Sequence, residues 1–350
     1  MGKAIYTLGL ASGNKAKVYS MYDNTDEVDE KYFPKKIFKG YATKKLRFVE
    51  SAFQQGKKSD VVILSHINLL SVGYCIKLLS PKTKLILITH GIEVWKTFSP
   101  FKKRMLQKCD LILPVSKFTK NTMIELNGFA EEKFHVLNNC LDPFLPAPVT
   151  GTKSEILLDK YGLKKDDIIL MTLTRLSSKE KYKGYDHVLT ALKDLRQQYP
   201  SLKYLIIGKY DTAERQRLDK ITKELGIEDF VVFAGFVADE VLAEHYNLAD
   251  IYIMPSKKEG FGIVFIEAMY YNKPVIAGNK DGSVDALNDG KFGLLVDPDN
   301  EIELTDAIKK MITDKNKYVV DHTDFMNKFS YPVYEKNIKT ILESDIINAK

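Results

Sequence analysis

The chain has 350 residues, 45% of them hydrophobic and 28% charged, which is typical of a soluble globular protein with two domains. No run approaches the roughly 18 apolar residues that span a bilayer, and the N-terminus lacks the charged-then-apolar pattern of a signal peptide. Three scattered cysteines and six dispersed histidines form neither a disulfide framework nor a metal-ligand spacing. We therefore expect a cytoplasmic protein that holds no metal ion.

Short apolar runs alternate with helical stretches along the whole chain. The strands expected in the first half are residues 16–23, 60–66, 84–91, 111–116 and 134–139. Those expected in the second half are residues 167–175, 202–208, 230–236, 250–256, 274–279 and 293–297. Runs that are apolar on both faces are typical of parallel strands covered by helices. The pattern predicts an α/β protein with two doubly wound, Rossmann-like domains that bind ligands at the carboxyl ends of their strands, in the crevice between them.

A stretch with three prolines and a glycine separates the two halves. It reads D-P-F-L-P-A-P-V-T-G-T, residues 142–152, and its composition is typical of a linker. We therefore place the N-terminal domain at residues 1–148 and the second domain at residues 149–328.

Positive charge is concentrated in the first domain. Residues 1–148 contain 23 Lys and Arg against 13 Asp and Glu, a net charge of +10, whereas the remainder has 29 against 33, a net charge of −4. Basic and aromatic residues alternate in W-K-T-F-S-P-F-K-K-R-M-L-Q-K, residues 95–108. Such a segment suits an anionic membrane surface, or it is an ordinary solvated helix face. Nucleic acid is disfavoured as a partner because no aromatic stacking platform or recognition motif accompanies the charge.

Two glutamates flank a Gly-Phe-Gly in K-K-E-G-F-G-I-V-F-I-E-A-M, residues 257–269. The loop 256–262 follows an expected strand, and residues 263–271 are expected to form a helix whose N-terminus suits a phosphate. Glu259 precedes this helix and Glu267 lies inside it, so their backbones are about 10 Å apart and their directions differ by about 80°. A retaining glycoside hydrolase needs carboxyl groups roughly 5 Å apart. The glutamates are therefore predicted to contact an elongated ligand at two places.

A second cluster of polar residues lies at the end of the expected strand 167–175. Arg175 ends this strand, and Lys183 and Gly184 open the next helix. Two cations at such a loop can bind a diphosphate, and arginine can do so through two parallel hydrogen bonds. A lysine at a helix start is commonly only solvated, so spacing alone leaves both interpretations open.

Together these motifs resemble glycosyltransferase family 4, the retaining nucleotide-sugar transferases of the GT-B fold, over nearly the whole chain. The second half matches through T-R-L, Y-K-G-Y-D, L-I-I-G, V-V-F-A-G-F, P-V-I-A and above all P-S-K-K-E-G-F-G-I-V-F-I-E-A-M, the family's glutamate-x7-glutamate motif. The first half matches less sharply, through I-T-H-G, L-P-V-S-K-F-T and V-L-N-N-C-L-D. The resemblance implies two Rossmann-like domains facing across a cleft. It also implies that residues 329–350 carry the last helix, which crosses back onto the first domain.

The resemblance further assigns catalytic roles to four side chains. Arg175 and Lys183 would neutralise the diphosphate, which gains charge as the glycosidic bond breaks. Glu259 would face the hydroxyls of the donor sugar. His90 would reach that sugar from the first domain, unless it is merely a strand-end histidine capped by backbone.

The remaining donor-binding residues lie around the same loop and at the N-terminus. Glu267 would accept hydrogen bonds from the ribose hydroxyls, and the main chain at Gly260, Phe261, Gly262 and Ile263 would contact the sugar and phosphates. The N-terminus M-G-K-A-I-Y-T-L-G-L-A-S-G-N is expected to be a helix, where the family has a strand and a glycine-rich phosphate loop. We therefore expect that strand and most of that loop to be missing from this chain, with Gly2 and Lys3 as the remnant of the loop.

Two smaller departures from the family pattern lie in the second half. D-G-S-V-D, residues 281–285, stands where the family usually has paired glycines and a glutamate, and Asn272 replaces a common glycine.

The sequence thus predicts an enzyme that transfers a hexose with retention from a UDP- or GDP-sugar to a glycan or lipid-linked glycan. Two cations and a helix terminus make a metal unnecessary, and no cofactor is expected beyond the donor substrate. The basic first domain is compatible with attachment to the inner face of the membrane. Two alternatives stay open: a non-catalytic partner or scaffold with the same fold, and a nucleotide-sugar 2-epimerase. A nicotinamide dehydrogenase is disfavoured because no G-x-G-x-x-G follows an expected strand.

Overall fold

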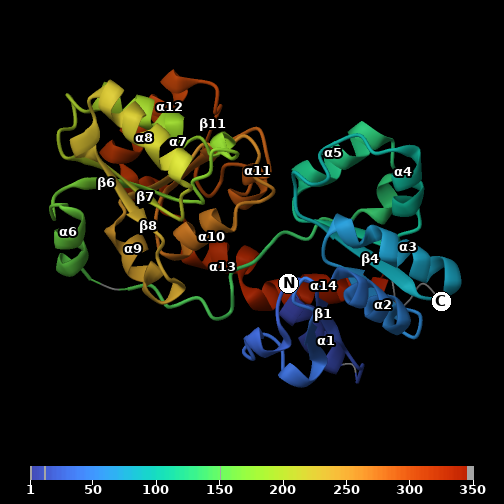
Figure 1. Ribbon diagram of the computed structural model, residues 1–350. Helices are drawn as coiled ribbons and strands as arrows, with labels where there is room; N and C mark the ends of the chain where they lie inside the picture. Colours follow the sequence, from blue (N-terminus) through green and yellow to red (C-terminus); the bar gives the residue numbers. More distant parts are fainter. Residues whose placement is uncertain (1, 12, 150, 345–350) are drawn as a thin grey trace. The chain divides into compact units, whose positions relative to one another are not determined.

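The structure is a computed structural model that describes residues 2–11, 13–149 and 151–344 (Figure 1). It divides into two compact units. The first unit contains the residues up to Cys140 together with the C-terminal helix from Tyr331, and the second runs from Leu141 to Ser330.

The first unit is built from two parallel sheets and the helices that flank them. Its strands are β1 (Val18–Ser20), β2 (Phe38–Gly40), β3 (Val61–Leu64), β4 (Lys84–Thr89) and β5 (Leu111–Pro114). Its α-helices are α1 (Gly2–Ala11), α2 (Lys45–Gly56), α3 (Leu70–Leu79), α4 (Pro100–Gln107), α5 (Lys117–Asn127) and α14 (Tyr331–Leu342). β1 pairs with β2, and β4 lies between β3 and β5 with Leu87 opposite both Leu64 and Ile112.

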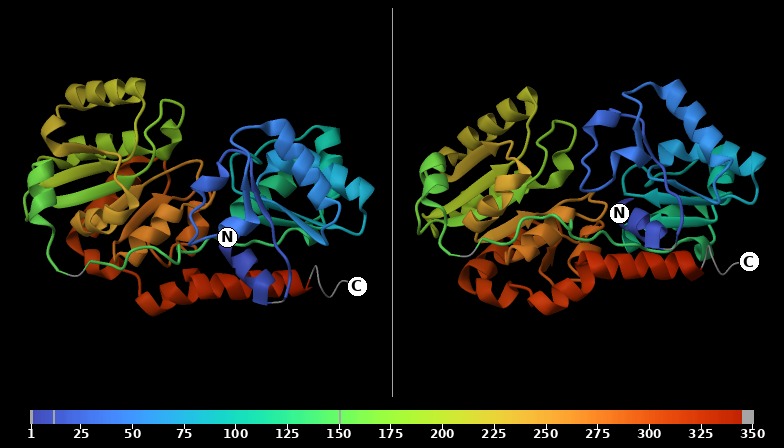
Figure 2. Two further views of the ribbon diagram at one scale, coloured as in Figure 1. Left: turned by 60° about the horizontal axis from the view of Figure 1, so that its bottom comes forward. Right: turned by 90° about the horizontal axis from the view of Figure 1, so that it is seen from below.

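The central strand β4 is buried on both faces. Leu85 and Leu87 belong to a core shared with α3 and α4, whereas Ile86 and Ile88 belong to a second core. Residues of α1 and α14 complete that second core, and the two helices lie side by side (Figure 2). Alternate residues of the strand therefore bury opposite faces of the sheet, as expected for a parallel sheet covered on both sides.

The second unit contains a six-stranded parallel sheet in the order β11-β10-β9-β6-β7-β8. The strands are β6 (Ile168–Leu173), β7 (Leu202–Ile207), β8 (Val231–Gly235), β9 (Ile251–Met254), β10 (Val275–Gly278) and β11 (Leu294–Val296). The α-helices are α6 (Glu155–Tyr161), α7 (Tyr185–Leu195), α8 (Thr212–Leu225), α9 (Leu242–Leu248), α10 (Ile263–Tyr270), α11 (Ser283–Ala286), α12 (Glu301–Thr313) and α13 (His322–Phe329). The strand order reverses at β6, which pairs with both β7 and β9. The loops after β6 and β9 therefore meet at a topological switch point, where sheets of this class bind ligands.

Apolar spacing explains how the helices of this unit pack. In α7 the buried residues include Tyr185, Val188, Leu189, Leu192 and Leu195, which form one face of a helix. This face joins residues of α8 and α12 in a single core against the sheet, and α9 and α10 lie on the opposite side (Figure 1).

Most of the strands expected from the sequence are present, but residues 134–139 do not form one. Phe134 makes an isolated bridge to Ile112, and Leu137 N–H donates to the carbonyl of Pro114 at 2.9 Å. The polar Asn138 then uses its side-chain amide to donate to the carbonyl of Val115 at 3.0 Å, so no regular ladder continues. Conversely, β2 is a strand that the apolar pattern did not reveal, because only three residues pair.

Both ends of the described chain are helical. Residues 2–11 form α1, as the sequence predicts. Near the C-terminus, α13 ends at Phe329 and Ser330 is extended, so α14 begins at Tyr331 rather than at Phe329. Pro332 lies in the first turn of α14, where its missing N–H is not needed. No helix among the described residues has the length and apolar content that would carry it across a membrane.

Candidate functional site

Two loops of the second unit are held against each other at the carboxyl edge of its sheet. Lys257, after β9, donates its N–H to the carbonyl of Tyr182, after β6, at 2.9 Å. Gly184 has φ +82°, and a Cβ at this position would lie 2.1 Å from the carbonyl oxygen of Pro255. Only glycine fits so close an approach in this conformation, so the K-G-Y-D motif allows the two loops to touch.

An ion pair joins these loops. Lys183 Nζ lies 2.6 Å from Glu259 Oε2, and the two side chains are only 16% and 19% exposed. Lys183 belongs to the short helical turn Lys181–Lys183 that precedes α7, and Glu259 precedes α10. The structure therefore brings together two of the residues that the sequence analysis placed at the site.

Arg175 lies on the same loop as Lys183 but has a different partner. Its guanidinium forms an ion pair with Glu180, whose side chain is 16% exposed, whereas that of Arg175 is 69% exposed. The loop thus presents two cations, each neutralised by a carboxylate, at the carboxyl end of β6. A phosphate that approached Arg175 would compete with Glu180.

The Gly-Phe-Gly segment offers main chain rather than side chains. The ring of Phe261 is buried and packs edge-to-face on Phe329, with 5.8 Å between ring centroids. Gly262 has φ +87° and is the N-cap of α10, and Ile263 in the first turn of this helix is 45% exposed. The free N–H groups at the start of a helix attract anions. The backbone at Gly260, Phe261, Gly262 and Ile263 is thus of the kind that binds phosphates and hydroxyls.

Glu267 lies in the second turn of α10 in an aromatic environment. Tyr246 donates its hydroxyl to Glu267 Oε2 at 3.2 Å, and the ring of Tyr246 stacks on Tyr271 with 4.7 Å between centroids. Burial raises the pKa of Glu267 to about 7, although the hydrogen bond from Tyr246 opposes the shift. Glu259 and Glu267 therefore have different partners and surroundings. Their contact with an elongated ligand at two places stays a prediction.

Asp281 is a site residue that sequence reasoning missed. Its buried carboxylate accepts hydrogen bonds from Ser256 Oγ at 2.7 Å, from Glu259 N–H at 2.6 Å and from Ser283 N–H at 2.9 Å. Burial raises its pKa, although these hydrogen bonds oppose the shift. The sequence signal is D-G-S-V-D at residues 281–285, which departs from the family pattern and gives no sign of the contact with Glu259.

The residue after Asp281 completes this support. Gly282 donates its N–H to the carbonyl of Glu259 at 2.8 Å, and a Cβ here would lie 2.1 Å from the carbonyl oxygen of Gly260. Asp281 and Gly282 thus hold the main chain on which Glu259 is carried.

The other predicted residues, His90, Gly2 and Lys3, lie in the first unit. His90 follows β4, its N–H donates to Glu93 Oε1 at 2.6 Å, and its Nε2 lies 2.8 Å from the carbonyl of Ser65. Gly2 and Lys3 form the first turn of α1, where Gly2 packs closely on Phe33. Their contact with a donor substrate stays a prediction. No group of three His, Cys, Asp or Glu side chains that could hold a metal ion occurs in the described part of the chain.

Two family models match most of the chain. Residues 10–143 match the model described as Glycosyltransferase Family 4, and residues 153–321 match the one described as Glycosyl transferases group 1. The second range contains every residue of the two loops described above.

Curated relatives are similar over much of the chain. The GDP-mannose-dependent alpha-(1-6)-phosphatidylinositol monomannoside mannosyltransferase of Mycobacterium tuberculosis is 30% identical over 260 residues, which cover 69% of this chain and 65% of the relative. The chain therefore spans less than two thirds of the length of that relative. The mannosylfructose-phosphate synthase of Agrobacterium fabrum is 24% identical over 371 residues, covering 91% of this chain and 80% of the relative.

Solved structures show the same fold. The Anabaena protein Alr3699/HepE, solved in complex with UDP, superposes with a TM-score of 0.80 at 21% identity, covering 98% of this chain and 96% of that protein. A glycosyltransferase from Rickettsia africae also gives a TM-score of 0.80, at 20% identity, with 99% and 94% covered. These structures have the GT-B fold, so the predicted fold class, α/β with two parallel-sheet units, is confirmed.

Proposed function

Because the chain belongs to glycosyltransferase family 4, we propose that it transfers a hexose from a UDP- or GDP-sugar to a glycan or lipid-linked glycan, with retention of anomeric configuration. The observation that carries the proposal is the ion pair of Lys183 and Glu259, at the switch point of the sheet and next to the N-terminus of α10. A cation, an anion and the main-chain N–H groups at the start of a helix thus lie at one edge of the sheet. These are the groups that bind the phosphates and hydroxyls of a nucleotide sugar.

Binding of the donor divides between the two loops. Lys183 and Arg175 bind the diphosphate, and on binding they exchange their carboxylate partners for phosphate oxygens. Glu259, released from Lys183 but still held by Asp281 through its N–H, accepts hydrogen bonds from hydroxyls of the sugar. Glu267 accepts hydrogen bonds from the ribose, and it does so most strongly when it is ionised.

Bond cleavage is assisted by the same groups. The leaving nucleoside diphosphate gains negative charge in the transition state, and preorganised cations and a helix N-terminus stabilise that charge without reorganisation. Each such contact is worth about 3 kcal/mol of barrier, or a hundredfold in rate. Lys183, Arg175 and α10 supply this stabilisation in our proposal, so transfer requires no metal ion. We assign no residue of these loops the role of covalent nucleophile. In the proposed mechanism the acceptor attacks the sugar from the same side as the departing phosphate.

The names of relatives support this choice of substrates. The M. tuberculosis relative is named for GDP-mannose and a phosphatidylinositol mannoside, and the Anabaena structure contains UDP. Both nucleotides therefore remain candidate donors, and a lipid-linked acceptor is supported.

A membrane surface is proposed as a further partner of the first unit. In this unit α3 and α4 pack together, and the Tyr74 and Phe101 rings lie 6.0 Å apart. Leu78, Leu79 and Phe101 are exposed. Apolar side chains on a unit of net positive charge are suited to an anionic lipid surface. By contrast, Trp95 is half-buried, packs against the core of the unit and donates to Thr119 Oγ1 at 3.2 Å, so it is not one of these exposed side chains.

Turnover with a panel of donors tests the proposal. UDP- and GDP-linked glucose, galactose, mannose and N-acetylglucosamine would each be incubated with glycan and lipid-linked acceptors, with and without EDTA. We expect one nucleotide class to give a glycoside whose anomeric configuration, read by NMR, equals that of the donor. Conversion of the donor alone, without transfer to any acceptor, would instead identify an epimerase.

A further inference from the structure

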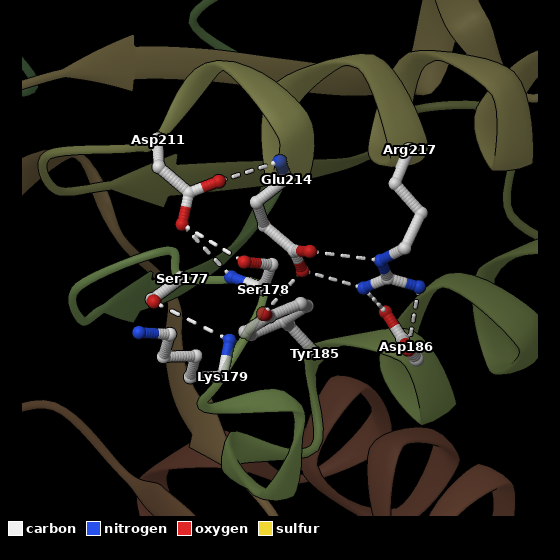
Figure 3. Close-up of polar contacts among 8 residues, drawn as sticks. All are labelled: Ser177, Ser178, Lys179, Tyr185, Asp186, Asp211, Glu214 and Arg217. Atoms are coloured by element: carbon white, nitrogen blue, oxygen red, sulfur yellow. Dashed lines mark hydrogen bonds and ion pairs between the residues drawn. The ribbon is translucent and has the colours of Figure 1, made fainter.

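Helix α8 and its N-cap residue contact the loop that carries Arg175 and Lys183 at two places (Figure 3). One contact is in the first half of the loop, and the other is where the loop enters α7. The loop runs from the end of β6 to the start of α7. Its first half is tied to the segment before α8 by two main-chain hydrogen bonds, from Leu176 N–H to the carbonyl of Lys209 at 2.8 Å and from Asp211 N–H to the carbonyl of Leu176 at 3.1 Å.

Asp211 fixes the first half of the loop with its side chain. It is the N-cap of α8, and its Oδ1 accepts the N–H of Glu214 at 2.8 Å. The other oxygen, Oδ2, accepts the N–H of Ser178 at 3.0 Å and the Oγ–H of Ser178 at 3.2 Å. A single carboxylate thus caps the helix with one oxygen and holds the loop with the other. Ser178 lies between the two residues of the other ion pair of this loop, three residues after Arg175 and two before Glu180.

Glu214 and Arg217 fix the other end of the loop. The side chain of Glu214 is fully buried, accepts the hydroxyl of Tyr185 and receives two hydrogen bonds from Arg217. Arg217 also donates two parallel hydrogen bonds to Asp186, at 2.9 and 2.8 Å. Tyr185 and Asp186 follow directly on Lys183 and Gly184 and open α7. The network therefore fixes the point at which the Lys183 loop enters the helix.

We propose that Asp211, Glu214 and Arg217 are positioning residues that hold Arg175 and Lys183 in place for the donor diphosphate. The inference rests on the proposed function, which assigns the two cations to the diphosphate. The Arg175 side chain is long and largely exposed. If the loop that carries it were unrestrained, side chain and loop would both lose conformational freedom when they bind a phosphate, which would weaken binding. Because α8 and its N-cap hold the loop at two places, that freedom is already restricted before the ligand arrives.

Asp211→Asn is the variant that separates positioning from folding. Asparagine is as good an N-cap as aspartate, so its Oδ1 can still accept the N–H of Glu214. The amide that replaces Oδ2 is a hydrogen-bond donor and cannot accept the N–H of Ser178. Substitution of Glu214 or Arg217 would leave a buried group without its partner and is expected to unfold part of the unit, so it is a poorer test.

Asp321→Asn is the matched control. Asp321 is the N-cap of α13 in the same unit and accepts the N–H of Asp324 at 2.9 Å, with the same geometry at the helix start. The same substitution therefore tests the effect of an Asp-to-Asn change at a cap that does not hold the Arg175 loop.

The measurement is the affinity of each variant for UDP, GDP and the corresponding nucleosides by calorimetry. For Asp211→Asn we expect the affinity for the bound nucleoside diphosphate to fall about tenfold, which is about 1.4 kcal/mol. The nucleoside affinity and the melting temperature should stay close to those of the unsubstituted protein. Asp321→Asn should match the unsubstituted protein with every ligand.

A double variant tests whether Asp211 acts through Arg175. In the Arg175→Ala background, Asp211→Asn should lower the diphosphate affinity by less than about twofold, since residues that act through one another are not additive. Unchanged diphosphate affinity of Asp211→Asn, with a clear loss in Arg175→Ala, would overturn the positioning role and leave the proposed function standing. If the unsubstituted protein binds neither UDP nor GDP, it is the proposed function that fails.

Discussion

Lys183 and Glu259 form an ion pair between the loop after β6 and the loop after β9, with 2.6 Å between Nζ and Oε2. Because both side chains are mostly shielded from water, neither charge can lose its partner without a substantial cost. A ligand that binds one of them must therefore satisfy the other as well. Diphosphate for the lysine and sugar hydroxyls for the glutamate would do so together.

Replacement of either partner should reduce turnover by different routes. In our proposal the charge of Lys183 stabilises the leaving diphosphate, so we expect Lys183→Ala to lower kcat/KM about a hundredfold or more. It also leaves Glu259 unpaired, so the free energy of unfolding should fall by up to about 3 kcal/mol. Steady-state kinetics and urea unfolding would measure both effects.

The double variant Lys183→Ala, Glu259→Gln serves as the control for this ion pair. Because glutamine needs no cationic partner, the double variant should regain most of the lost stability without regaining turnover. Recovery of turnover in the double variant would contradict a direct role for Lys183 at the diphosphate.

Glu180 is predicted to oppose phosphate binding. It is the partner of Arg175 in the structure, so Glu180→Gln should free the guanidinium and remove a nearby negative charge. The affinity for the nucleoside diphosphate should rise by about two- to fivefold, with a smaller gain at high salt because Arg175 is exposed. Titrations at low and at high salt would measure the gain. A lower affinity of Glu180→Gln would show that Arg175 needs Glu180 for its orientation.

Glu267 should make nucleotide affinity depend on pH near neutrality. Burial raises the pKa of this carboxyl to about 7, so part of the protein carries it protonated at neutral pH. If ribose hydroxyls donate to it, only the ionised form binds well, and affinity should increase as the pH rises from 6 to about 8. Glu267→Gln should bind weakly and without this pH dependence. Calorimetry at several pH values would check both expectations.

The same group should make stability depend on pH in the opposite direction. The pKa of Glu267 in the folded protein lies above its unfolded value, so the folded state binds more protons between about pH 4.5 and 7. Its contribution to stability is present below this window and is lost as the pH rises through it. Relative to Glu267→Gln, the unsubstituted protein should lose about 3 kcal/mol of unfolding free energy across the window. Urea unfolding of both proteins at pH 5 and pH 7.5 would test this; parallel stability curves would argue against it.

Asp281 is predicted to be needed for the geometry of the Glu259 loop. Its carboxylate accepts three hydrogen bonds, of which two come from main-chain N–H groups that cannot reverse their direction. Asp281→Asn places an N–H donor against one of these and should destabilise the unit by about 1–3 kcal/mol. Turnover should fall more than nucleotide affinity, because our proposal assigns Glu259 to the sugar rather than to the nucleotide. Thermal melting and steady-state kinetics would be compared with Asp306→Asn, the same change at an exposed position of α12.

The sequence revealed the strands and the two loops better than it revealed what supports them. Apolar runs such as residues 202–208 and 250–256 could be predicted as strands because a parallel sheet covered on both faces buries both sides of each strand. Glu259 and Lys183 could be placed at the carboxyl edge of the sheet because each follows such a strand. The supporting roles of Asp281 and Asp211 could not be predicted. Their partners, Glu259 and Ser178, lie 22 and 33 residues away, and no local pattern specifies such contacts. Residues 134–139 were mistaken for a strand because their apolar character is real but their pairing with β5 is incomplete.

Calorimetric titration of UDP and of GDP into the protein and into Glu267→Ala tests the central claim most directly. We predict that one of the two nucleotides binds with a clear preference and that the binding is lost or strongly weakened in Glu267→Ala. This result would establish that the loops after β6 and β9, together with α10, form a nucleotide-sugar site. Absence of binding by either nucleotide to the unsubstituted protein, or equal binding to Glu267→Ala, would contradict the claim.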